Sequence, residues 1–431
     1  GSIFWESGSS ALITGPGRFR VQGDWEFRSG ANVNLTSGYV YFEGSNAYSY
    51  IRNYDRDCAL GNVFISKSTG ELWYSSSTTD TLTINGYLYI NSGDVFYSNT
   101  NYPLVLKGQF YNYGHLECPY GTFIFKGSTQ NADLNTGDFF NHLVIQPTGT
   151  VNVVDSLRVN GHLTIASGVL VAGAHPVFVG GDWNNAVGPA GFDEGTGKVV
   201  FNGGNYHQIC SDETFYTLEV DKPLGGAFRT GNNDVTCSFY DWTAGAVDVA
   251  AGSFTADNLG DNALFGSFYV NPGGVINLTN PDGYVDLNGY LYNYGGTINV
   301  YSNPGYGDSY WPWSANAGIT MTGGILDFKN TGIWVYSNGL TFSENITAGT
   351  IRTAAGFQVD RAEYTPSGGL LEFYGSADGS FRARNGGYVR NVLLNKSGTD
   401  APVSGTVPHL DRLTGEVTDV PLLNNISLSG S

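Results

Sequence analysis

Charged residues are scarce in this sequence: they make up 13% of its 431 positions, about half the share in an average soluble protein. Lys and Arg total 20 against 38 Asp and Glu, so the net charge is −18. The few cations form no basic stripe, which argues against a nucleic-acid-binding protein. Apolar runs of about eighteen residues are also missing, so no membrane-spanning helix is expected.

Long helices are not expected either, because few windows of about twelve residues are free of Gly and Pro. Gly, with 61 residues, is about twice as frequent as usual. Gly does not recur at every third position, which excludes collagen. The 28 Tyr, 25 Phe and 8 Trp argue against a disordered chain. The composition therefore predicts a large all-β protein.

Cysteine and methionine are rare, with four residues and one residue respectively. The cysteines lack the CxxC spacing of a zinc site. Cys210 and Cys237 lie 27 residues apart, near the coil length derived below, so a disulfide between neighbouring coils is one interpretation and buried free thiols are the other. Because the chain does not start with Met, we interpret it as processed or truncated, and a missing signal peptide does not argue for the cytoplasm.

A seven-residue pattern, Gly-x-h-x-Phe-x-Gly with h an apolar residue, recurs through the chain. Its copies begin at Gly38, Gly121, Gly197, Gly283 and Gly369, the fourth having Leu287 in place of Phe. The steps between copies are 83, 76, 86 and 86 residues. Such near-regular spacing indicates a repeat protein, and we interpret it as a super-repeat of about 80 residues.

A shorter motif interleaves with the first, as GYLYI at residues 86–90 and GHLTI at residues 161–165. Its two apolar residues point to the same side of a strand, while the flanking Gly marks a corner. Equivalent Gly residues follow after 22 positions, from Gly86 to Gly108, and after 20 positions, from Gly161 to Gly181. This spacing is typical of one turn of a parallel β-helix, so the super-repeat spans about four coils.

We therefore predict an all-β fold: a parallel β-helix, or β-solenoid, of roughly nineteen coils, right-handed and without substantial helix. Residues 1–30 are expected to form an N-terminal strand for capping or assembly, and residues 31–431 a continuous solenoid with the four-coil super-repeat. Phe125, Phe201 and Phe373 are expected at equivalent core positions. The rival fold, a β-propeller, lacks its WD or kelch signatures here.

The segments NGYLYINSG (85–93), SGVLVAG (167–173) and FYTLEVDK (215–222) resemble the repeat-rich secreted β-helix surface proteins of Bacteroidota and related phyla. The resemblance covers most of the chain and implies an extracellular or cell-surface location. The motifs that carry the resemblance are structural, and they imply no catalytic activity. Such proteins often have a C-terminal sorting domain, which is not recognisable here. Pectate-lyase-like enzymes share the predicted fold, but a fold does not fix a function.

No motif for catalysis or metal binding stands out. A glycosidase needs two facing carboxylates. No spacing selects a pair among the candidates on outward strand positions, which are Asp241, Asp248, Asp327, Asp360 and Glu372. The segment 52–57 has the Arg and Asp residues of a β-helix lyase, with a loop of local ion pairs as the alternative. The six His residues are scattered singly. We expect no cofactor and no metal; calcium held by acidic loops is the alternative, without a specific motif.

Two aromatic features suggest binding surfaces. In the segment 306–313, Tyr310, Trp311 and Trp313 are predicted to stack on a sugar or a partner, or else to pack back on the solenoid. Outward tyrosines are more numerous than solubility favours, which suggests contact with other chains. They are Tyr39, Tyr41, Tyr87, Tyr89, Tyr111 and those at 290–294.

The first strand, with Ile3, Phe4 and Trp5, is predicted to add to the last coil of another copy, because solenoid ends have unpaired backbone groups. Repeated head-to-tail contacts of this kind give a filament. The sequence thus predicts an extracellular structural protein that self-assembles into a filament, sheath or surface layer, with copies of itself as partners. The alternative is a cell-surface carbohydrate-active enzyme (lyase-like or hydrolase-like) or a carbohydrate-binding adhesin on the same fold, with polysaccharide as partner.

Overall fold

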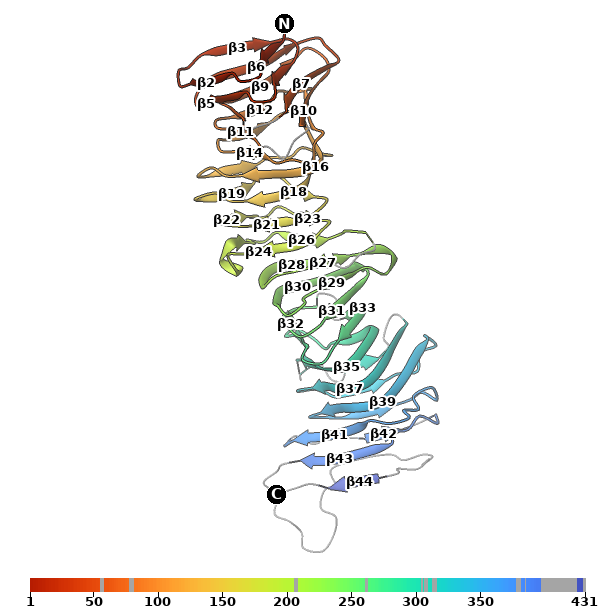
Figure 1. Cartoon of the computed structure of the whole chain (residues 1–431). Coiled ribbons are helices and arrows are strands. Elements are labelled where there is room, and N and C mark those ends of the chain that lie inside the picture. The colour runs from red at the N-terminus through yellow and green to blue at the C-terminus, as the bar shows by residue number, and fades with distance from the viewer. Residues whose placement is uncertain are drawn as a thin grey trace, which may run out of the picture. The chain divides into compact units, whose positions relative to one another are not determined.

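The structure is a computed structural model that describes residues 1–54, 58–76, 81–204, 208–259, 263–303, 305, 309–311, 316–376, 381–383, 385–396 and 425–428. Over these residues the fold is all-β, with 1% helix, and forms a parallel β-solenoid of about 16 turns, as Figure 1 shows. The predicted fold class is therefore confirmed. The chain divides into two compact units, 1–203 and 204–431, and residues 1–30 supply the first strands of unit 1.

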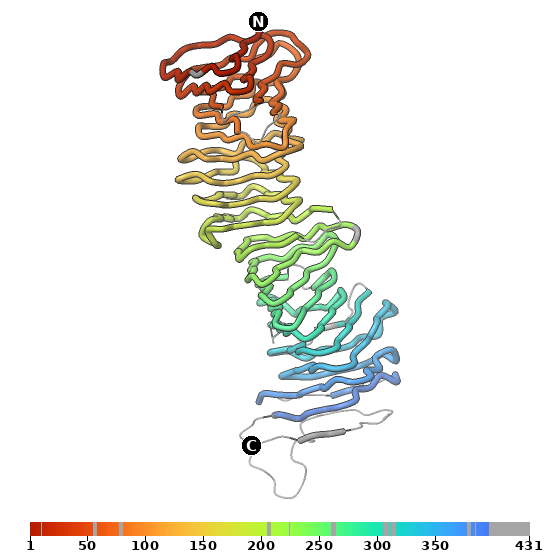
Figure 2. Tube along the Cα trace, in the orientation of Figure 1, coloured from red at the N-terminus to blue at the C-terminus, as the bar shows by residue number. Residues whose placement is uncertain are grey.

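In unit 1 the coils stack on one another (Figure 2). Each coil contributes short strands that pair in parallel with those of the next coil, and the pairings define three faces. The strands β16 (His115–Phe125) and β18 (Phe139–Ile145) turn a corner and belong to faces 3 and 1. Face 1 also contains β2 (Ser10–Ile13), β5 (Asn32–Leu35), β8 (Cys58–Leu60), β11 (Leu82–Ile84), β14 (Leu104–Leu106), β21 (Leu163–Ile165) and β24 (Trp183–Asn185). Face 2 contains β3 (Arg18–Val21), β6 (Tyr39–Gly44), β9 (Asn62–Lys67), β12 (Leu88–Ile90), β15 (Phe110–Asn112), β17 (Gln130–Ala132), β19 (Thr150–Val153), β22 (Val169–Val171) and β25 (Phe192–Asp193). Face 3 also contains β1 (Ile3–Trp5), β4 (Trp25–Phe27), β7 (Tyr48–Asn53), β10 (Glu71–Ser76), β13 (Val95–Ser98), β20 (Leu157–Val159), β23 (Val177–Val179) and β26 (Lys198–Phe201).

Unit 2 has three parallel stacks as well, and its long strands β35 (Asp286–Ser302), β37 (Ala317–Phe328) and β39 (Phe342–Thr353) each belong to two of them. The first stack also contains β27 (Gln208–Ile209), β29 (Ala227–Arg229), β31 (Ala246–Val249) and β33 (Ala263–Val270). The second also contains β28 (Glu213–Asp221), β30 (Asp234–Ala244), β32 (Ser253–Ala256), β34 (Val275–Asn280), β41 (Leu370–Gly375), β43 (Asn391–Lys396) and β44 (Asn425–Leu428). The third consists of β36 (Ser309–Trp311), β38 (Ile333–Val335), β40 (Phe357–Val359) and β42 (Phe381–Ala383). The described helix is limited to two single-turn 3₁₀ segments, η1 (Pro189–Gly191) and η2 (Pro223–Gly225).

The core of each unit follows from strand alternation. In β12, Leu88 and Ile90 are fully buried whereas Tyr89 between them is half-buried on the outer side. Successive side chains of a strand point to opposite sides, so each three-residue strand places two apolar residues inside. The three residues predicted for the core are all fully buried, as expected: Phe125, Phe201 and Phe373.

Copies of the seven-residue pattern lie on different faces. Phe42 lies in β6 on face 2, Phe125 in β16 on face 1, and Phe201 in β26 on face 3. The steps between these copies are therefore not whole numbers of coils, and Phe125 and Phe201 do not occupy equivalent positions. All three faces share the same inward alternation, so one strand motif fits any of them.

Gly is required at the corners between strands for two different reasons. A Cβ at Gly108 would lie 2.1 Å from the carbonyl oxygen of Gly86 on the preceding coil, so only Gly lets these corners stack so closely. Gly93 instead has a φ of 82°, in the left-handed region that residues with a side chain rarely adopt. The regularly spaced Gly residues of the shorter motif belong to the first kind, since close approach is what requires them.

Coil count and handedness both differ from the expectation. The length of a coil is uneven along the chain, because Leu104 lies opposite Phe123 whereas Val300 lies opposite the more distant Phe328. Dividing the whole chain by one short coil length therefore overestimates the number of turns. Handedness was not encoded in the pattern, because inward and outward residues alternate in the same way in a coil of either hand.

The burial of Phe125 gives a test of this strand assignment. Its ring lies among three other core rings, those of Phe110, Phe123 and Phe140, with centroids 5.0 to 6.3 Å away. Phe125→Ala should lower the free energy of unfolding by about 3–5 kcal/mol, because it leaves a cavity. Urea denaturation followed by circular dichroism measures the change.

The control for this variant is Phe4→Ala, which alters a side chain that is 47% exposed. It should cost less than about 1 kcal/mol. Equal stability of the two variants would mean that the inward and outward positions are wrongly assigned.

Candidate functional site

The N-terminal strand β1 is part of the stack of face 3. It pairs in parallel with β4, with Ile3 opposite Trp25, and the rings of Trp5 and Trp25 lie 6.0 Å apart. Phe4 is 47% exposed, with the Arg28 guanidinium over its ring at 5.1 Å, whereas Ile3 and Trp5 are half-buried. Assembly through Ile3, Phe4 and Trp5 stays a prediction, and the structure leaves Phe4 the most accessible of the three.

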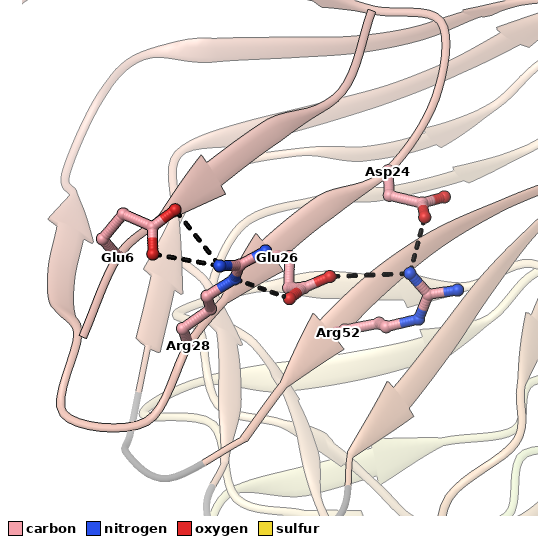
Figure 3. A network of polar contacts seen from close by, with 5 residues as sticks. All are labelled: Glu6, Asp24, Glu26, Arg28 and Arg52. Carbon is pink, nitrogen blue, oxygen red and sulfur yellow. Dashed lines mark hydrogen bonds and ion pairs between the residues drawn. The ribbon is translucent and has the colours of Figure 1, made fainter.

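Five charged side chains connect the first coils from outside (Figure 3). Arg28 lies between two carboxylates, with Nη1 3.0 Å from Glu6 Oε2 and Nε 3.0 Å from Glu26 Oε1. Arg52 Nη1 lies 2.5 Å from Asp24 Oδ2 and 3.6 Å from Glu26 Oε2. The hydrogen bond from Arg28 to Glu26, followed by the charge of Glu6, raises the pKa of Arg28. The network ties β1, β4 and β7 together on the outer surface.

Face 2 carries a surface of aromatic side chains on or next to β6, β9, β12 and β15, here called the aromatic face. Its members are Tyr39, Tyr41, Phe64, Tyr87, Tyr89, Tyr111 and Tyr113. The parallel register places Tyr41 opposite Phe64, and Phe64 opposite Tyr89. The first two rings stack at 5.0 Å with an interplanar angle of 22°, and the second two at 5.4 Å and 26°. These rings turn their faces to one another and their edges to solvent.

The aromatic face is most exposed beside β15. Tyr87, Tyr111 and Tyr113 are 42%, 37% and 57% exposed. The planes of Tyr87 and Tyr111 are inclined by 55°, so these rings do not cover each other. In the described strands of face 2 from β9 to β19, every outward side chain is uncharged. The result is a neutral, partly apolar surface on a strongly acidic chain.

Face 3 carries a second aromatic column on β7, β10 and β13. Trp73 lies opposite Tyr50 on one side and Tyr97 on the other. Its ring stacks on Tyr97 at 4.5 Å, while Tyr50 approaches edge-on at 6.0 Å. The indole N–H of Trp73 donates to Glu71 Oε2 at 2.6 Å, and desolvation raises the pKa of Tyr97. The rings of this column contact one another, and Tyr48, whose ring lies 5.3 Å from that of Trp73, is 51% exposed.

One of the three predicted aromatic binding residues, Trp311, is not exposed as expected. Trp311 lies in β36, opposite Val335, and is buried with its ring edge-on to Phe342 at 5.3 Å. Trp311 is therefore a core residue, and its interpretation as a binding residue is wrong. Tyr310 lies opposite Trp334 in the register, and Trp313 is outside the described residues.

The predicted disulfide between Cys210 and Cys237 is not present, since all four cysteines are buried thiols. Cys237 lies opposite Phe215, while the backbone N–H of Cys210 donates to the Arg229 carbonyl at 3.0 Å. The two residues are thus on neighbouring coils but at different positions along them. Burial raises the pKa of both thiols, so the protonated form is favoured at neutral pH.

Two histidines stack on face 1 of unit 1. The rings of His142 and His162 lie 5.0 Å apart and nearly parallel, at 5°. Nδ1 of His142 accepts the backbone N–H of His162 at 3.0 Å, and Nδ1 of His162 accepts that of Asp182 at 2.9 Å. The proton of each neutral ring is therefore on Nε2, which leaves no lone pair for a metal. Desolvation, with a smaller contribution from His162, lowers the pKa of His142.

In unit 2 the structure brings together two carboxylates that sequence reasoning could not pair, Asp327 and Glu372. Arg352 lies between them, because β37, β39 and β41 stack with these three residues in register. Arg352 Nη1 is 3.2 Å from Asp327 Oδ2, and its Nε is 2.8 Å from Glu372 Oε2. Asn395 adds a hydrogen bond from Nδ2 to Glu372 Oε1 at 2.9 Å.

Asp327 is only 1% exposed and has partners on both carboxylate oxygens. Lys329 Nζ lies 2.7 Å from Oδ2, and the Tyr374 hydroxyl donates to Oδ1 at 2.7 Å. Desolvation, followed by the hydrogen bond to Asp327, raises the pKa of Tyr374. A carboxylate held in this way is not free to accept a substrate proton. We call Asp327, Lys329, Arg352, Glu372, Tyr374 and Asn395 the Arg352 cluster.

The other candidate carboxylates have partners outside this cluster. Asp248 Oδ2 lies 2.8 Å from Arg229 Nε, and Asp360 Oδ2 accepts the indole N–H of Trp334 at 3.0 Å. Asp241 accepts the backbone N–H of the next residue at 3.0 Å. The structure therefore joins Asp327 and Glu372 into one cluster and leaves these three on separate contacts.

Sequence reasoning missed the cations and the tyrosine of the Arg352 cluster. The available signal was opposite charge at coil spacing, since Arg352 follows Asp327, and Glu372 follows Arg352, after about one coil each. The lyase-like interpretation of segment 52–57 is not supported by Arg52, which belongs to the network in Figure 3. Residues 55–57 lie outside the described residues.

Comparison with known proteins adds no function. No family model, no curated protein and no solved structure matches this chain, so the resemblance to Bacteroidota surface proteins gains no support beyond the solenoid itself. In the part of the chain that the structure describes, no helix is long and apolar enough to cross a membrane. Within the same residues, no group of three or more His, Cys, Asp or Glu could hold a metal ion.

The His142 stack predicts a pH dependence. Folding lowers the pKa of His142 below its ordinary value of 6.5, so the unfolded chain binds a proton more readily. The stability that depends on the neutral ring is therefore complete above about pH 6.5 and is lost as the pH falls through the lowered pKa. Wild type should lose thermal stability from about pH 6.5 to about pH 5 relative to His142→Asn, whose amide oxygen can accept the same backbone N–H without titrating. Calorimetry across this range measures the difference, and parallel profiles would contradict the prediction.

The Tyr374 hydroxyl gives a second prediction for this site. Tyr374→Phe removes a hydrogen bond to the buried Asp327 carboxylate, so unit 2 should lose about 1.5–3 kcal/mol of stability. The matched control is Tyr301→Phe, because Tyr301 is 37% exposed on the same surface and should tolerate the change within about 0.5 kcal/mol. Chemical denaturation measures both, and equal effects would mean that Asp327 does not depend on this hydroxyl.

Proposed function

We propose that this chain is an extracellular structural protein whose solenoids pack against one another through the aromatic face, so that copies assemble into a filament, sheath or surface layer. The observation that carries the proposal is the exposure of Tyr87, Tyr111 and Tyr113 next to one another on face 2. Contiguous exposed aromatic surface on a protein of this kind marks a contact site. Strand addition at Ile3, Phe4 and Trp5 would extend such an assembly lengthwise.

The charge distribution supports a second copy as the occupant of this surface. Two chains that each carry a net charge of −18 repel one another unless the surfaces that meet are neutral. Face 2 offers such a surface from β9 to β19, where the outward side chains of the described strands are aromatic, amide or hydroxyl groups. The outward side chains of these strands add no carboxylate to such a contact.

The ring geometry also favours a protein partner over a sugar on this face. Phe64 lies between Tyr41 and Tyr89, with both of its faces covered. A sugar ring packs on an open aromatic face, whereas edges and hydroxyls suit side chains and backbone groups of another chain. Stacked rings are also rigid, so little side-chain freedom is lost when they are buried.

The triple variant Tyr87→Ser, Tyr111→Ser, Tyr113→Ser tests the proposal. Wild type should sediment as larger species when its concentration is raised in analytical ultracentrifugation. The variant should weaken this association about tenfold or more, because exposed tyrosines at the centre of a contact carry much of its binding energy.

The matched control replaces three tyrosines of similar exposure elsewhere, Tyr120, Tyr294 and Tyr301, which are 50%, 41% and 37% exposed. It should associate like wild type. A wild-type protein that stays monomeric at every concentration, or a control that loses association equally, would overturn the proposal.

Carbohydrate binding is the second candidate, and the Arg352 cluster favours it. Lys329 and Arg352 are partly exposed, at 31% and 28% of their side chains, and the Arg352 guanidinium lies over the Tyr374 ring at 4.4 Å. Cations beside aromatic rings are suited to binding a sugar with a negative charge. Enzymatic cleavage of a polysaccharide has less support, because Asp327 and Glu372 both form ion pairs with Arg352.

A further inference from the structure

The Arg352 cluster holds two cations close together on the outside of unit 2. Lys329 Nζ and Arg352 Nη1 both approach the same oxygen, Asp327 Oδ2, at 2.7 and 3.2 Å. Two like charges would otherwise separate, so the shared carboxylate is what keeps them together. The Tyr374 hydroxyl fixes that carboxylate from its other oxygen. The arrangement is thus held by a residue that is itself almost completely buried.

The anions of the cluster lie beneath and the cations lie above. The side chains of Asp327 and Glu372 are 1% and 12% exposed, whereas those of Lys329 and Arg352 are 31% and 28% exposed. The cations are therefore the more exposed members of these ion pairs. On a chain with a net charge of −18, paired exposed cations are an unusual local feature.

Both cations have hydrogen-bond donors to spare. A guanidinium has five N–H groups, of which Arg352 uses one on Nε for Glu372 and one on Nη1 for Asp327. The Lys329 ammonium has three N–H groups and contacts Asp327 with one of them. The remaining donors have no further partner among the described residues, and a planar anion can accept several of them at once.

Two tyrosines lie beside these cations. Tyr374 lies under the Arg352 guanidinium at 4.4 Å and holds its plane in place. Tyr301, which is 37% exposed, follows Val300, and Lys329 follows Phe328, the residue opposite Val300. Tyr301 and Lys329 therefore stand next to each other on neighbouring coils. Tyrosine rings beside a cation pair offer apolar contact to the carbon skeleton of a sugar whose charged group meets the cations.

We propose that the Arg352 cluster binds the anionic groups of an acidic polysaccharide, either the carboxylates of uronic acids or sulfate esters. Lys329 and Arg352 bind the charged group, and Tyr301 and Tyr374 pack against the sugar ring. The inference rests on carbohydrate binding, the second candidate function, and is independent of assembly through the aromatic face. Asp327 acts here as a positioning residue that holds the two cations and does not itself touch the ligand.

Binding is tested on the full chain by calorimetric titration at about 0.15 M salt with three probes: a short oligogalacturonate, a sulfated oligosaccharide and a neutral cello-oligosaccharide. At least one anionic probe should bind, and the neutral probe should bind more weakly. Lys329→Gln should weaken the anionic probe roughly threefold to tenfold, since it removes one cation and leaves Asp327 paired with Arg352. Arg352→Gln should weaken it more, and circular dichroism shows whether that variant folds.

The control is Arg158→Gln, because Arg158 is also a cation over an aromatic ring, that of Phe178 at 4.6 Å, but belongs to unit 1. It should bind like wild type. The response to the two anionic probes distinguishes uronate from sulfate. The proposal is overturned if neither anionic probe binds, or if Lys329→Gln binds as well as wild type. Strong binding of the neutral probe alone would also overturn it, while leaving carbohydrate binding in place.

Discussion

The whole structure depends on parallel backbone pairing between successive coils in a fixed register. Each strand is only a few residues long, and its inward side chains are stacked on those of the coils before and after it, as Leu163 is on Leu143 and Trp183. A short strand alone buries too little to be stable, so every coil depends on its two neighbours. The corners must stack as closely as the strands, which is why a Cβ at Gly108 would meet the Gly86 carbonyl. The register therefore determines which side chains meet in the core, and it also determines which side chains lie next to one another on the surface.

On the outside, the same register converts single residues into columns. Tyr41, Phe64 and Tyr89 form one column because their strands are paired residue by residue, and their stacking contributes roughly 0.5–1.5 kcal/mol for each ring pair beyond burial. Where charged residues of neighbouring coils lie opposite each other, opposite signs are favoured, since like charges about 4.8 Å apart repel; Glu219 opposite Asp241 departs from this preference. Asp327, Arg352 and Glu372 follow it, and so do Glu26 and Arg52. The surfaces that we connect with function are thus products of the packing rule that builds the core.

This rule also explains how far the sequence could be interpreted. Alternation within a strand is local, so the burial of Phe125, Phe201 and Phe373 could be predicted from two apolar residues spaced by two. Which of the three faces a strand belongs to could not be predicted, because all faces share that alternation and coil length varies along the chain. Pairing Asp327 with Arg352 and Glu372 requires knowing the lengths of two successive coils, which are unequal. Trp311 was misjudged for a related reason: it lies in a strand of a coil with an irregular length, where the aromatic run looked like a loop.

The two proposed surfaces make different demands on a chain of net charge −18. Long-range repulsion acts on another copy and on a polyanion alike, but it is screened over about 8 Å at physiological salt. Beyond that range neither partner is attracted, so binding must come from contacts made at short distance. The aromatic face meets this condition because its outward side chains from β9 to β15 are uncharged and its stacked rings are rigid, which lets apolar burial act without opposing charge. The Arg352 cluster meets it differently, because Asp327 and Glu372 offset the charge of the two cations while Asp327 holds their remaining donors in place. Affinity at that cluster should therefore depend on donor geometry more than on net charge, and loss of a single well-placed donor should matter more than a change of charge elsewhere on the chain.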